Sequence, residues 1–62
     1  MQTVGVKAVA LMNGAEVFIP GEGAWVILFK AVDGIFVNVE MSRQGVKKRT
    51  WFYVDDIVNK VI

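Results

Sequence analysis

The fold is decided by residues 24–54, AWVILFKAVDGIFVNVEMSRQGVKKRTWFYV. Two reversals, Asp33-Gly34 and Arg43-Gln44-Gly45-Val46, divide this stretch into three runs rich in Val, Ile and aromatic residues. Such runs between glycine-containing turns predict a three-stranded antiparallel meander. Both predicted faces of this meander are apolar, whereas a sheet in water needs only one apolar face. The second face therefore favours a partner that covers it.

Reversals continue outside the meander, at Asn13-Gly14 and at residues 20–23. We predict strands over residues 6–12, 15–19, 24–32, 35–41 and 47–54. The first of these segments also fits one face of a helix, because Val6, Val9 and Ala10 lie at helical spacing. Residues 55–62 open with two acids that suit a capped helical turn before a closing strand. Alternatively, the tail forms a helix of two turns that buries Ile57, Val58 and Val61.

The segment Gly14-Ala15-Glu16-Val17, the short loop at 20–23 and the ending Tyr53-Val54-Asp55-Asp56-Ile57 with Val61-Ile62 resemble the SH3-like small β-barrels. The resemblance covers residues 13–62. It implies an all-β fold, a small SH3-like barrel of about five short antiparallel strands, with a short helical turn near the C-terminus. The length of 62 residues leaves room for a single domain, over residues 1–62. It implies a fold and no particular activity. Such barrels also occur in phages and mobile elements, so the resemblance allows that origin.

Alternation along the strands assigns the meander residues to two faces. With Val32 opposite Ile35 across a two-residue turn, one face is mostly aliphatic and becomes the predicted core: Val26, Leu28, Lys30, Val32, Ile35, Val37, Val39, Met41, Lys48, Thr50, Phe52 and Val54. The other face is rich in aromatic residues: Trp25, Ile27, Phe29, Ala31, Phe36, Asn38, Glu40, Lys47, Arg49, Trp51 and Tyr53. A β-bulge, or a second loop of three or five residues, would swap these assignments.

Composition narrows the function classes. The chain has 62 residues, no Cys and no His, 55% hydrophobic residues, 21% charged residues and a net charge of +1. Disulfides and ordinary zinc sites are excluded, and the commonest general base and best nucleophile are missing. We therefore expect no enzyme activity, no catalytic residues, no cofactor and no metal site. The N-terminus lacks a secretion signal and the longest apolar run has six residues, so we expect a cytoplasmic protein without a membrane span.

The aromatic-rich face is the predicted binding site. Large apolar groups rimmed by a few polar ones are typical of recognition surfaces. We expect it to act by homo-oligomerisation or by docking to a protein partner, through Trp25, Phe29, Phe36, Asn38, Glu40, Arg49, Trp51 and Tyr53. The alternative is that the N-terminal segment or the tail covers part of this face, Trp25 and Ile27 above all, and makes it ordinary core.

The basic stretch at 43–49 indicates a second binding function. Cations that contact phosphates beside aromatic rings that stack on bases are typical of single-strand binders. The residues predicted for a nucleic-acid site are Arg43, Lys47, Lys48, Arg49, Trp51 and Tyr53. The competing interpretation is a solvated hairpin tip, whose charges discourage aggregation between sheet edges.

Overall fold

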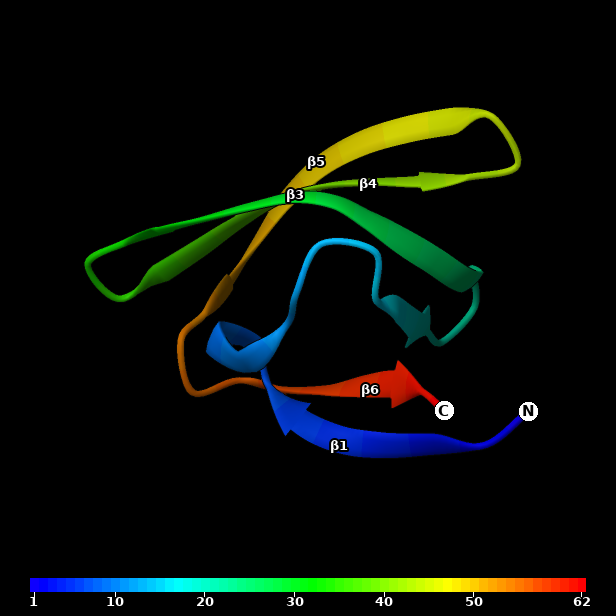
Figure 1. Ribbon diagram of the computed structural model, residues 1–62, viewed down its shortest axis with the longest axis horizontal. Coiled ribbons are helices and arrows are strands. Elements are labelled where there is room, and N and C mark those ends of the chain that lie inside the picture. Colours follow the sequence, from blue (N-terminus) through cyan, green and yellow to red (C-terminus); the bar gives the residue numbers. More distant parts are fainter.

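A computed structural model describes all residues 1–62 and shows an antiparallel sheet of six strands with one short 3-10 helix (Figure 1). The elements are β1 (Thr3–Lys7), η1 (Ala8–Ala10), β2 (Glu16–Ile19), β3 (Gly23–Asp33), β4 (Phe36–Arg43), β5 (Val46–Tyr53) and β6 (Ile57–Val61). The all-β prediction is confirmed. The tail is a strand and not a helix, and the helical turn lies at η1 near the N-terminus, not near the C-terminus.

The strands are ordered β1-β6-β2-β3-β4-β5 in the sheet. The last strand returns to lie between the first two, so both termini meet at one side of the molecule (Figure 1). β1 and β5 form the two edges and do not pair with each other, so the sheet curls without closing into a barrel. A hollow of about 190 Å³ lies among β2, β5 and β6, with Val17, Phe52 and Val58 in its lining.

The β3–β4 turn differs by one residue from the prediction. Asp33 pairs with Phe36, so Gly34 and Ile35 are the two turn residues, and Gly34 has a φ of +60°. A turn with glycine at its first central position needs only that one positive φ. Val32 pairs with Val37 in place of Ile35, which is a shift of two positions along β4. Because alternation has a period of two, the paired residues near this turn keep their predicted faces, but Val32 and Ile35, which were predicted in the core, are exposed.

A β-bulge at Leu28 interrupts the pairing of β3 with β4. Ile27 pairs with Met41, but the next pair is Phe29 with Glu40, so Leu28 has no partner. The extra residue moves Ile27 and Trp25 to the inner face and leaves Val26 and Leu28 exposed. The predicted positions of these four residues are therefore wrong. The register of β4 with β5, by contrast, has the predicted parity along its whole length.

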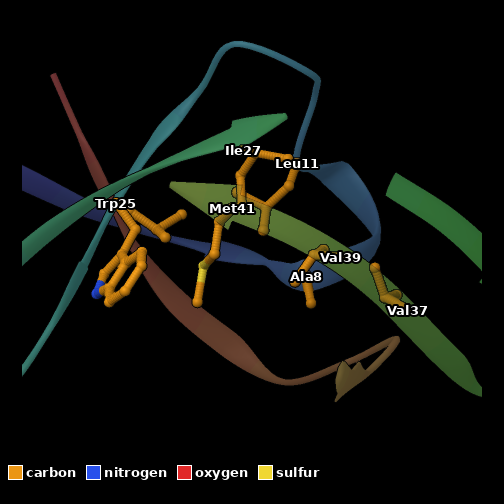
Figure 2. Close-up of a cluster of buried hydrophobic side chains, with 8 residues drawn as sticks. Ala8, Leu11, Trp25, Ile27, Val37, Val39 and Met41 are labelled. Atoms are coloured by element: carbon orange, nitrogen blue, oxygen red, sulfur yellow. The ribbon is translucent and has the colours of Figure 1, made fainter. Parts of the chain in front are cut away.

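Eight side chains form the buried core: Ala8, Leu11, Val17, Trp25, Ile27, Val37, Val39 and Met41. They come from η1, the segment after it, β2 and the inner face of β3 and β4. Figure 2 shows them in a row, with Trp25 at one end and Val37 at the other. Val6 and Val58 pack against this row from β1 and β6. The core therefore occupies only the inner face of the curled sheet.

Hydrogen bonds to the β5–β6 connection and to β3 hold η1 in place. The amides of Ala8 and Val9 donate to the carbonyls of Asp56 and Val54, at 2.8 and 3.2 Å. The Val9 carbonyl accepts from Lys30 Nζ at 2.7 Å. This contact explains why a lysine lies on the otherwise apolar inner face of β3, since its charge reaches a carbonyl at the margin of the core. The structure contains no helix that is long and apolar enough to cross a membrane.

Candidate functional site: the outer face of the meander

The outer face is the side of β3, β4 and β5 that points away from the core. It consists of Val26, Phe29, Ala31, Asp33, Phe36, Asn38, Glu40, Ser42, Lys47, Arg49, Trp51 and Tyr53, which alternate with inward residues along the three strands except at Leu28. Neither the N-terminal segment nor the tail is in the same layer, because β1 and β6 lie on the opposite side of the core (Figure 1). Most of the predicted aromatic face is therefore open to solvent.

Three aromatic rings contact one another at the end of this face that lies beside the β3–β4 turn. Phe36 and Trp51 have centroids 5.3 Å apart in an edge-to-face arrangement, and Trp51 and Tyr53 are related in the same way at 5.1 Å. Phe36 and Tyr53 are 5.7 Å apart. Each ring holds the other two in place, so the cluster loses little conformational freedom when a partner covers it. Trp51 nevertheless remains 50% exposed.

Phe29 extends the apolar surface toward the other end of the face. It lies opposite Glu40 and is 58% exposed. Phe29, Asn38, Glu40 and Arg49 line an open hollow of about 380 Å³ above the backbone of β4 and β5. The hollow is bordered by one ring, one amide, one carboxylate and one guanidinium, and can accept both an apolar and a charged group.

Glu40 and Arg49 lie directly opposite each other, as predicted. They form no ion pair with each other within 4.0 Å. The two ion pairs of the structure are Lys7 with Asp55 and Lys48 with Glu22. The charges of Glu40 and Arg49 are therefore available to another molecule.

Trp25 was predicted on the aromatic face, but the structure places it in the core with 6% exposure. Its ring lies under Lys48, whose Nζ is 4.7 Å from the ring centroid and 2.8 Å from Glu22 Oε1. Trp25 Nε1 is buried and has no hydrogen-bond partner. Of the eight residues predicted to bind a partner, the other seven lie together on the outer face.

The basic stretch is divided between the two faces of β4 and β5. Lys47 and Arg49 belong to the outer face, beside Trp51. Lys48 points inward to Trp25 and Glu22, and Arg43 packs on Gly23, where an added Cβ would lie 3.0 Å from the Arg43 Nε atom. Only two of the four predicted cations therefore share a surface with the exposed rings.

The two adjacent acids at the start of the tail have structural partners. Asp56 Oδ2 accepts from the Tyr53 amide at 2.9 Å, and its own amide donates to the Tyr53 carbonyl at 3.1 Å. Asp55 pairs with Lys7 at 3.4 Å. These contacts fix the reversal between β5 and β6, and thereby the end of the strand that carries Tyr53.

Sequence reasoning missed that Val26 and Leu28 are exposed, at the edge of the outer face. The signal was the unbroken run of large apolar residues at 25–29, which has no alternation to fix a register. Comparison of the chain with family models, with curated proteins and with solved structures finds no match.

Proposed function

We propose that this protein is a non-enzymatic binding module that associates with a protein surface through its outer face, and that it does so first of all by self-association. The observation that carries this proposal is the ring cluster of Phe36, Trp51 and Tyr53, exposed on the opposite side of the sheet from the core. Rigid, exposed aromatic clusters are the type of surface from which binding hot spots form.

The area supports a weak and reversible association. The four outer-face rings, Phe29, Phe36, Trp51 and Tyr53, are on average about half exposed. Since a buried aromatic residue covers about 150–250 Å², these rings offer about 400 Å². A stable interface buries about 800 Å² on each partner, so the neighbouring stems of Lys47 and Arg49 must contribute the remainder. We therefore expect micromolar rather than nanomolar affinity.

The fold-level part of the proposal is an open relative of the SH3-like architecture. Strands β2 to β6 follow the order of elements that the resemblance implies: an opening strand, a three-stranded meander and a last strand. Two features differ: the sheet is not closed, and a turn replaces the helical element before the last strand.

Replacing Trp51 with Ala tests the proposal. Sedimentation from low micromolar to near-millimolar concentration is expected to show a reversible increase in mass for the wild-type protein. Trp51→Ala should raise the dissociation constant about tenfold or more, because it removes the central ring of the cluster. Lys48→Ala and Ile62→Ala serve as controls, since Lys48 points inward and exposed Ile62 lies beyond β6. A wild-type protein that stays monomeric, or equal losses in all three variants, would contradict the proposal.

A nucleic-acid function is the second candidate, favoured by one observation: Lys47, Arg49 and Trp51 share a face. The same face also carries Glu40 and Asp33, so its formal charge is balanced. Fluorescence anisotropy with a labelled single strand and a duplex, at two salt concentrations, separates the candidates. Binding that weakens steeply with salt would support a nucleic-acid function, and the absence of binding to both probes would contradict it.

A further inference from the structure

Residues of the outer face are arranged in four rows across β3, β4 and β5. Residues directly opposite one another in the sheet share a row. The first row is at the β3–β4 turn and the fourth is at the β4–β5 turn: Asp33-Phe36-Tyr53, Ala31-Asn38-Trp51, Phe29-Glu40-Arg49 and Val26-Ser42-Lys47. On β5 the two rings occupy the first two rows and the two cations the last two. Along β5 the face is therefore aromatic at one end and positively charged at the other.

We propose that the outer face recognises a second copy of this chain in one orientation, with the strands of the two copies antiparallel. This inference rests on the proposed self-association and adds its geometry. A two-fold axis between the stacked sheets would cross the strands over Lys30, Val39 and Thr50, which occupy one row of inward residues. Each strand then faces its own counterpart, with the first row over the fourth and the second over the third.

The strand β5 is self-complementary in this orientation. Trp51 of each copy faces Arg49 of the other, and Tyr53 faces Lys47. A guanidinium or ammonium over an aromatic ring is attracted to it, and more strongly when both are removed from water. Neither cation has an ion-pair partner within its own chain, so no existing contact is broken.

The second and third rows of the other two strands also match. On β4, the amide of Asn38 in each copy faces the carboxylate of Glu40 in the other, which pairs a donor with a charged acceptor. On β3, Ala31 faces Phe29, so the small side chain leaves space for the large ring, whereas Asp33 faces Val26 at the ends of the strand without a specific match. Glu40 and Asn38 both line the 380 Å³ hollow, which is the space into which these groups would enter.

The alternative two-fold axis, parallel to the strands, fits less well. This axis would place β3 of one copy over β5 of the other, and β4 of one copy over β4 of the other. Each residue of β4 would then face the same residue of the second copy. Glu40 would then face Glu40, and two carboxylates of like charge would be brought together at the interface. The charge at Glu40 therefore favours the antiparallel orientation.

Opposite charge changes at Asn38 test this orientation. Asn38→Asp places a carboxylate against Glu40 of the second copy, and should weaken dimerisation about five- to tenfold. Asn38→Lys places an ammonium there, and should strengthen it by at least about threefold. The measurement is the dissociation constant from sedimentation, with circular dichroism to verify that each variant is folded. Asn59→Asp and Asn59→Lys are the matched controls, because exposed Asn59 lies on β6 and the net charge changes equally.

The outcomes separate this inference from the proposed function. Net charge alone predicts the opposite signs, since the chain carries +1 and Asn38→Lys raises it. A dimer that both Asn38 variants weaken, or that Glu40→Gln strengthens, would overturn the antiparallel orientation and leave the proposed self-association standing. A wild-type chain that is monomeric at all concentrations would overturn both.

Discussion

Leu28 adds one unpaired residue to β3, and this bulge places Trp25 in the core, whereas Trp51 on β5 stays on the outer face. On its N-terminal side, Trp25 and Ile27 turn toward the core; on its C-terminal side, Phe29 remains on the outer face. The parity of β4 and β5 could be predicted because a loop of two or of four residues gives the same parity, and the observed loop has two, Gln44 and Gly45. The bulge could not be predicted, because the apolar run at 25–29 gives either register an apolar face.

Variants with a single tryptophan test these positions at the residue scale. Trp51→Phe retains only Trp25, whose emission should be blue-shifted and protected from acrylamide because the ring is buried. Trp25→Phe retains only Trp51, which should emit at longer wavelength and be quenched readily in dilute solution. Equal quenching in the two variants would mean that the bulge does not divide the faces in this way.

Most of the strands could be predicted, since Gly-containing reversals separate runs of Val, Ile and aromatic residues. The closing strand was one of the two forms predicted for the tail, whereas the position of the N-terminal helix η1 could not be predicted, because it depends on distant contacts. Ala8 and Val9 donate to carbonyls between β5 and β6, almost fifty residues away along the chain. Val6, Val9 and Ala10 fit a helical face, but the helix spans only three residues, between Lys7 and Leu11. Tertiary hydrogen bonds, not local preference, set its position.

Lys30→Met tests how η1 is attached to the sheet. The variant keeps most of the half-buried stem but leaves the Val9 carbonyl without its donor. We expect the free energy of unfolding to fall by about 1 kcal/mol, the usual contribution of such a hydrogen bond. Urea denaturation measures the change, with Lys60→Met as a control because exposed Lys60 donates no side-chain hydrogen bond. Equal stability of the two variants would show that the Lys30 contact does not hold η1.

At the scale of the whole molecule, one curled sheet separates a core from a second apolar surface. The sequence predicted that separation, and seven of the eight residues assigned to the binding face lie there. It could not predict the open seam between β1 and β5, because closure depends on the curvature of the entire sheet and not on any local motif. The inner face is filled by only eight buried residues, and the outer rings are left without a covering segment.

The most direct test of the outer face as an interface is a dilution series of nitrogen–proton correlation spectra. The chain contains two indole N–H groups, one at Trp51 on the outer face and one at Trp25 in the core. The Trp51 signal should shift progressively with protein concentration, while the Trp25 signal stays fixed as an internal reference. Indole signals that are both unchanged from low micromolar to near-millimolar concentration, or a shift at Trp25 alone, would contradict this account.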